Sequence, residues 1–69
     1  MAVHPPVIVH PPSLTGGRRV TVRGEILGLA YSLPDLFEFL RRAGLDADEV
    51  SLDDAELIEW RGGGPDVWT

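Results

Sequence analysis

The chain contains no cysteine, and this absence constrains what its 69 residues can fold into more than any other feature. Small domains often depend on disulfides or thiolate-bound metals, because a chain of this size buries too little apolar surface to offset its conformational entropy comfortably. Neither device is available here. The chain must therefore rely on one small hydrophobic core, and self-association is a natural further source of burial.

The composition favours a folded domain outside the membrane. Hydrophobic residues make up 43% of the chain and charged residues 25%, which argues against a wholly disordered protein. The longest apolar runs are much shorter than the roughly 18 residues that a membrane span needs. The first residues lack the charged and then apolar pattern of a secretory signal. We therefore expect a cytoplasmic protein that does not contact membranes.

The clearest element is a helix predicted over residues 33–43. Apolar side chains recur there at helical spacing and cover about 160° of one side. Ser32 is expected to cap the first turn with its hydroxyl, while Asp35 reaches back toward the cap. Pro34 fits the first turn, whose N–H groups have no acceptor within the helix. Gly44 is the expected left-handed stop. The apolar side is formed by Leu33, Leu36, Phe37, Phe39, Leu40 and Ala43.

Three segments are predicted to be strands. Residues 18–22 alternate, with Val20 and Val22 on one face and Arg19 and Thr21 on the other. A tight turn at Arg23-Gly24 would lead into a returning strand over 25–30, for which a short helix over 25–31 is the alternative. Residues 56–60 read as a final strand, with a helix over 52–60 as the alternative.

The first 17 residues differ from the rest. The tetrapeptide Val-His-Pro-Pro occurs at residues 3–6 and again at 9–12. Proline lacks an N–H and, with its neighbours, favours extended backbone. We interpret residues 1–17 as an extended arm or loop, which could include a short edge strand near residues 7–10.

These elements predict a small α+β domain over residues 18–69, in the order ββαβ, preceded by the proline-rich arm over residues 1–17. The helix is expected to cover one face of the sheet. The expected core consists of Val20, Val22, Ile26, Leu29, Leu36, Phe37, Leu40, Leu45, Ile58 and Trp60.

The net charge of −5 is distributed unevenly. Residues 1–34 carry three arginines and one acid, whereas residues 35–69 carry three arginines and ten acids. This balance argues against a general nucleic-acid binder, which needs an excess of cations. The acidic segment over residues 46–59 is either a solvated surface or a docking surface for a basic partner. Its candidate partner-binding residues are Asp48, Glu49, Asp53 and Asp54.

The patterns of metal sites and of catalysis are absent from the sequence. His4 and His10 are the only histidines, and without cysteine they cannot complete a zinc site. Asp46 and Asp48 begin an EF-hand-like spacing, but the positions that need a glycine and a bidentate glutamate hold other residues. Ser32 and the other serines lack a neighbouring histidine. We therefore expect no enzyme activity, no metal and no cofactor.

The favoured hypothesis is a regulatory module that acts through protein–protein contact. Phe39 lies at one edge of the apolar side of the helix, and Trp68 has no assigned place in the core. Both are therefore candidates for contact with a partner protein or with a second copy in a homodimer.

Two alternatives remain open. The first is a ligand- or nucleic-acid-binding domain in which Arg19, Arg23 and Arg61 hold an anion and an aromatic ring stacks against it. The candidate rings are Trp60, Trp68 and Tyr31. The second is a small enzyme. The positions of Trp60 and Trp68 distinguish the favoured hypothesis from the first alternative, because buried tryptophans cannot stack on a ligand beside the arginines.

Overall fold

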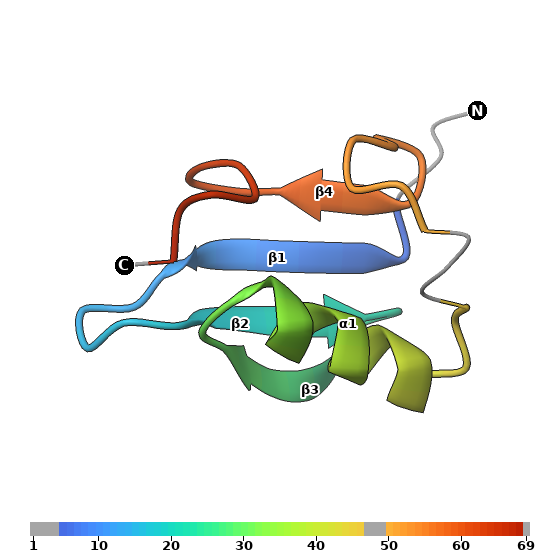
Figure 1. Ribbon diagram of the computed structural model, residues 1–69, viewed down its shortest axis with the longest axis horizontal. Helices are drawn as coiled ribbons and strands as arrows, with labels where there is room; N and C mark the ends of the chain where they lie inside the picture. The colour runs from blue at the N-terminus through green and yellow to red at the C-terminus, as the bar shows by residue number, and fades with distance from the viewer. Residues whose placement is uncertain (1–4, 47–49, 69) are drawn as a thin grey trace.

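The computed structural model describes residues 5–46 and 50–68 and has one helix and four strands in a single mixed sheet (Figure 1). The strand order is β3-β2-β1-β4; β1 pairs antiparallel with β2 and parallel with β4, and β2 pairs antiparallel with β3. The predicted α+β class is confirmed, with one strand more than the predicted ββαβ order. The elements are β1 (Val7–Pro12), β2 (Arg18–Val22), β3 (Glu25–Ala30), α1 (Leu33–Arg42) and β4 (Ile58–Trp60).

The additional strand, β1, lies in the middle of the sheet between β2 and β4. The short strand expected near residues 7–10 is therefore present, but it is central and not at the edge of the sheet, so residues 7–12 belong to the domain and not to an arm. Val7 donates its N–H to Leu57 at 3.1 Å, and Val9 accepts from the N–H of Arg61 at 2.9 Å. Residues 1–4 of the predicted arm lie outside the described residues.

The prolines of β1 are compatible with this central position because of where they fall. Val7 and Val9 direct their backbone bonds toward β4. Every second residue of β1 directs its backbone groups to the same side, so Pro11, like Val7 and Val9, faces the β4 side. Strand β4 ends at Trp60, so no strand residue there needs the N–H that Pro11 lacks. Pro12 pairs with Arg18 across a register irregularity. The proline pair therefore sits where the sheet no longer needs donors.

The hairpin between β2 and β3 forms as the sequence predicts. Arg23 and Gly24 have φ angles of 53° and 83°, which suit a two-residue turn that joins antiparallel strands. The helical alternative over residues 25–31 is wrong. The register shifts within the hairpin, so that Val20 faces Gly28 and Thr21 faces Ile26. This bulge changes which residues of β3 face the core.

The helix α1 spans residues 33–42, as predicted except that Ala43 is the C-cap. Its start differs from the expectation: Ser32 makes no side-chain cap bond, and Asp35 accepts a bond from the N–H of Tyr31 at 3.0 Å. At the other end Gly44 has a φ of 87°, and Leu45 donates its N–H to Leu40 at 2.9 Å. This is the expected left-handed termination.

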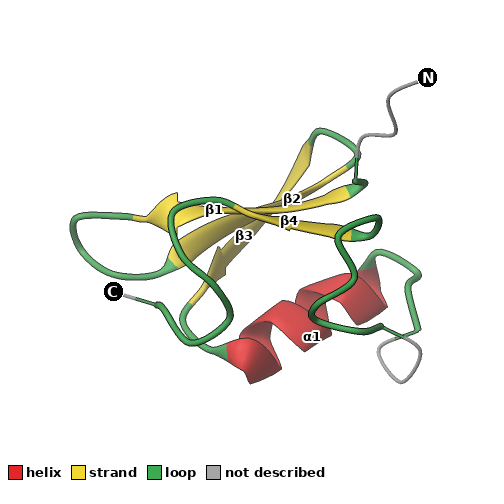
Figure 2. Ribbon diagram, turned by 90° about the horizontal axis from the view of Figure 1, so that it is seen from above, coloured by secondary structure: helices red, strands yellow, loops and turns green. Residues whose placement is uncertain are grey.

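The core lies between α1 and one face of the sheet, which we call the covered face (Figure 2). The predicted core residues Ile26 and Leu29 are instead exposed. The hairpin register pairs Ile26 with the outward-facing Thr21, and the bulge turns Leu29 outward and Gly28 and Ala30 inward. Phe37, Leu45 and Trp60 are partly buried against the core. The fully or almost fully buried apolar residues are Val7, Val9, Val20, Val22, Ala30, Leu36, Leu40 and Ile58.

Residues 50–57, which belong to the described part of the acidic segment, form turns and loop and not a strand or a helix. The carbonyl oxygen of Asp54 accepts from the N–H groups of Leu57 and Ile58 at 3.1 and 2.9 Å. The strand predicted over residues 56–60 therefore begins only at Ile58, and the helical alternative over 52–60 is wrong. The C-terminal segment, residues 61–68, then returns over the covered face beside the end of β1 (Figure 2).

Candidate functional site

The candidate site is the sheet face opposite α1, which none of the described segments covers (Figure 2). We call it the open face. Two of its aliphatic side chains are strongly exposed: Ile26 retains 62% of its accessible surface and Leu29 retains 42%. The strand registers and alternation assign eight residues to this face, namely Ile8, His10, Arg19, Thr21, Ile26, Leu29, Glu59 and Arg61.

The registers arrange these residues in two rows across the strands. In the first row Ile26, Thr21, Ile8 and Glu59 are successive partners from β3 to β4. In the second row Leu29 is the partner of Arg19, while His10 and Arg61 follow directly after the paired Val9 and Trp60. We call the first row, which contains Ile8 and Ile26, the aliphatic row. We call the second row, which contains the three basic side chains, the basic row.

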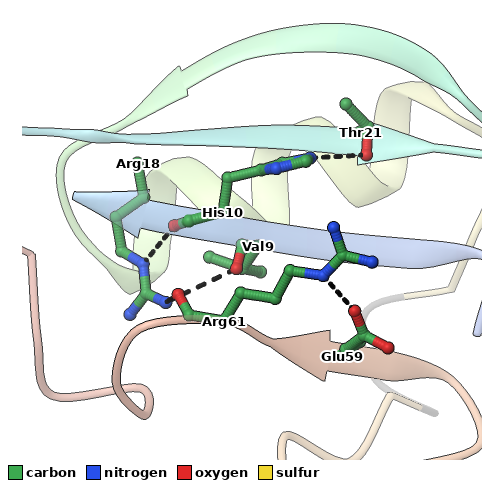
Figure 3. A network of polar contacts seen from close by, with 6 residues as sticks. All are labelled: Val9, His10, Arg18, Thr21, Glu59 and Arg61. Carbon is green, nitrogen blue, oxygen red and sulfur yellow. Dashed lines mark hydrogen bonds and ion pairs between the residues drawn. The ribbon is translucent and has the colours of Figure 1, made fainter. Parts of the chain in front are cut away.

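His10 lies at the centre of the basic row (Figure 3). Its Nε2 atom shares a hydrogen bond of 3.1 Å with Oγ1 of Thr21. Partial burial lowers the pKa of His10, the nearby guanidinium groups of Arg61 and Arg19 lower it further, and Glu59 opposes them. These surroundings favour the neutral form of the imidazole beside the two arginine cations.

The two arginines of the basic row differ in their partners. Arg61 forms an ion pair with Glu59, which follows from their positions two residues apart on the same face (Figure 3). Arg19 is exposed and has no ion pair within the described residues. Of the predicted anion-binding set, Arg19 and Arg61 therefore share one face, whereas Arg23 lies in the hairpin turn at the end of β2.

The tryptophans do not lie beside these arginines. Trp60 and Trp68 are on the covered side, where their rings meet edge to face with centroids 6.3 Å apart. The indole N–H of Trp60 donates to the Leu52 carbonyl and that of Trp68 to the Pro65 carbonyl, both at 2.9 Å. The two tryptophan rings are therefore absent from the open face. Tyr31, directly after β3, keeps 59% of its accessible surface, with its ring against Gly17.

Between the two tryptophans lies Arg18, a residue that the sequence analysis did not single out. Its side chain is completely buried, and its burial lowers its pKa. The guanidinium group donates to the carbonyl oxygens of five residues at 2.8–2.9 Å and more distantly to Val9 at 3.4 Å. The five acceptors are His10, Arg61, Gly63, Gly64 and Val67. A signal was present: the alternation that turns Val20 and Val22 inward turns Arg18 inward too.

The other predicted partner-binding residues are spread over the molecule. Phe39 packs its ring on Gly28, and Trp68 packs beside Arg18, so both have contacts within the domain. Asp53 and Asp54 are exposed, and each carboxylate accepts a local hydrogen bond. The bond from Ser51 lowers the pKa of Asp53. Asp48 and Glu49 lie outside the described residues.

A shallow hollow of about 390 Å³ lies beside β4 at the margin of the open face. It is lined by Pro5, Asp53, Ala55, Ile58, Glu59 and Trp60. Within residues 5–46 and 50–68, no three histidine or acidic side chains are placed to hold a metal ion. In the same part of the chain, no helix has the length and apolar character needed to cross a membrane.

Comparisons with protein-family models, with curated proteins and with solved structures give no significant match.

Proposed function

We propose that this protein is a non-enzymatic module that binds another protein through the open face of its sheet. The observation that carries this proposal is the exposure of Ile26 and Leu29 on a face that no described segment covers. Exposed aliphatic side chains that lie together on a sheet are typical of interaction surfaces, because their burial by a partner is favourable.

The chemistry of the open face supports binding over catalysis. Its polar groups are two arginines, a histidine bonded to Thr21, and a glutamate paired with Arg61. These groups lie on a sheet surface and not in a deep pocket from which water would be excluded, as catalysis usually requires. The hollow beside β4 collects only Asp53 and Glu59 as ionisable groups.

Nucleic-acid binding is the second candidate, favoured only by the basic row. Single-strand binders combine cations with exposed aromatic rings on which the bases stack. On this protein both tryptophans enclose Arg18 on the other side of the sheet, and Tyr31 is the one strongly exposed aromatic ring among the described residues. The strongly exposed apolar side chains assigned to the open face, Ile26 and Leu29, are aliphatic. This difference favours a protein partner.

The proposal is tested by affinity capture with three forms of the protein. The double variant Ile26→Ser/Leu29→Ser removes the aliphatic contacts of the open face. The variant Leu14→Ser is the matched control, because Leu14 is a fully exposed leucine in the loop between β1 and β2. We expect one protein to be retained by the parent and by Leu14→Ser but lost by the double variant, and to bind again when purified. Equal retention by all three forms would contradict the proposed surface.

A further inference from the structure

The open face is basic although the chain carries a net charge of −5. Among the eight described residues assigned to this face, Glu59 is the one acid, against Arg19, Arg61 and the titratable His10. Apart from Glu25 at the start of β3, the other described acids lie in α1 and in the loops. The acidic residues that were predicted to form a docking surface therefore lie elsewhere on the molecule. The open face is basic, so a partner with negatively charged groups is complementary to it.

The spacing of the basic row suits several carboxylates of one polypeptide segment. Arg19, His10 and Arg61 lie on or next to three adjacent strands, which in a sheet are about 4.8 Å apart. The aliphatic row with Ile8 and Ile26 is displaced by about 7 Å, two residues along the strands. Carboxylates and aliphatic side chains that alternate on one surface of a partner would match both rows at once.

Arg19 provides the strongest attraction for such a partner. A guanidinium group without an ion pair in the described structure can bind a carboxylate with two parallel N–H donors. Arg61 is already paired with Glu59. A carboxylate of the partner can bind Arg61 only by replacing Glu59, so Arg61 is the second contact. His10 lies between them and adds a positive charge only when it is protonated.

Resting on the proposed function, we infer that the partner of the open face is an acidic polypeptide segment. Its carboxylates contact Arg19, His10 and Arg61, and its aliphatic side chains pack against Ile26 and Leu29.

The position of His10 makes the binding dependent on pH. Arg61 and Arg19 disfavour the imidazolium form, and Glu59 favours it. A carboxylate placed beside the ring adds a further favourable charge and raises the pKa of His10. By linkage, the segment must bind more tightly as the pH falls through the titration range of His10.

The experiment uses the full chain and three named probes. The first is a short synthetic peptide of glutamate and leucine, with the leucines at helical spacing; the second has lysine in place of each glutamate; the third is an oligothymidylate. Binding is followed by NMR through the backbone amide signals of β1 and β2 and through the pH titration of the His10 ring. We expect the glutamate peptide alone to bind, to shift the signals of the open face, and to raise the pKa of His10.

Variants then locate the contact. Arg19→Ser should weaken binding of the glutamate peptide about threefold to fivefold, the loss expected for one exposed charge pair. The matched control is Arg42→Ser, which removes an arginine from the exposed side of α1 and should leave the affinity unchanged. The affinity should also fall as the salt concentration rises.

Several results would overturn the inference. Equal binding of the lysine peptide, preferential binding of the oligothymidylate, or no binding of the glutamate peptide would each do so. Self-association through the open face, measured by sedimentation velocity and lost in Arg19→Ser, would replace the acidic segment with a second copy. If the peptide fails but a captured protein still depends on Ile26 and Leu29, the proposed function stands and only the acidic character of the partner is wrong.

Discussion

The guanidinium carbon of Arg18 lies 5.3 Å from the centre of the Trp60 ring, on the covered side of the sheet. Trp68 lies on the same cation at 5.8 Å. No carboxylate pairs with Arg18 within the described residues; its N–H groups are satisfied by backbone carbonyls, four of them from residues 61–67. This single side chain therefore fastens the C-terminal segment to β1 and β2, without a disulfide or a metal.

Replacing Arg18 with lysine should destabilise the domain by about 2–4 kcal/mol. The ammonium group has three donors where the guanidinium group has five, so at least two partly buried carbonyls lose their partner, at a cost of about 1–2 kcal/mol each. Arg19→Lys is the matched control, since the next side chain in β2 is exposed on the open face and its change should cost less than about 0.5 kcal/mol. Thermal unfolding followed by circular dichroism measures both, and similar Tm values for the two variants would contradict the role of Arg18.

The hairpin and the helix could be predicted because their signals are local. Gly24 and Gly44 occupy positions of positive φ, and apolar spacing alone identifies α1. The central position of β1 could not be recognised in this way, although the sequence allows a short edge strand there. Its prolines argue against a central strand, because proline has no N–H for the neighbouring strand. Pro11 is acceptable because β4, which is distant in sequence, ends at Trp60. Local patterns do not contain that information.

The candidate site was predictable only in part, for the same reason. Alternation in β2 correctly separates Arg19 and Thr21 from Val20 and Val22. The bulge between the Val20 and Thr21 pairs turns Leu29 to the open face, and Gly28 is the one residue type in β3 that indicates a bulge. Ile26 reaches the same face through the register of the turn, which pairs it with Thr21. The neighbourhood of His10, Arg19 and Arg61 depends on the sheet order, which places the first and last strands side by side.

Leu40→Ala should leave the domain largely unfolded at room temperature. Leu40 is completely buried between α1 and the covered face, and truncating such a leucine costs about 2–5 kcal/mol. That is comparable to the whole stability expected of a domain of this size. Arg42→Ala, two residues away on the exposed side of α1, should change the stability by less than about 0.5 kcal/mol. Chemical denaturation measures the unfolding midpoints of both variants and of the parent. An unchanged midpoint for Leu40→Ala would mean that a different side of α1 faces the core.

Gly28→Ala should destabilise the domain by about 1–3 kcal/mol. Gly28 has a φ of 147°, and an added Cβ atom would lie 3.0 Å from Cζ of Phe39. Gly64→Ala is the control, because its Cβ atom would meet only Oδ1 of Asp66 at 3.6 Å. The difference in Tm between these variants measures the close packing of α1 on β3. A stabilising effect of Gly28→Ala would show that Phe39 does not rest on this glycine.

The last prediction concerns the pH dependence of stability, which follows from the surroundings of His10. Its ring is partly buried against Thr21 and faces Arg19 and Arg61, so its pKa in the folded state is lower than in the unfolded chain. The unfolded chain therefore binds more protons in the interval between the two pKa values. Its upper limit is the unfolded value, about 6.5.

Because the unfolded state takes up the extra proton, the free energy of unfolding must rise with pH across that interval. The contribution of His10 is fully present above about pH 6.5 and is lost as the pH falls through its folded pKa. The free energy of unfolding of His10→Gln should therefore depend less on pH between pH 7 and the range where carboxylates titrate. His4 is present in the parent and in the variant, so it does not contribute to the difference. Glu38 and Asp53, whose pKa values are also lowered, contribute only at more acidic pH. Urea unfolding at a series of pH values measures the two curves; parallel curves would mean that His10 is solvated like a free histidine and senses neither arginine.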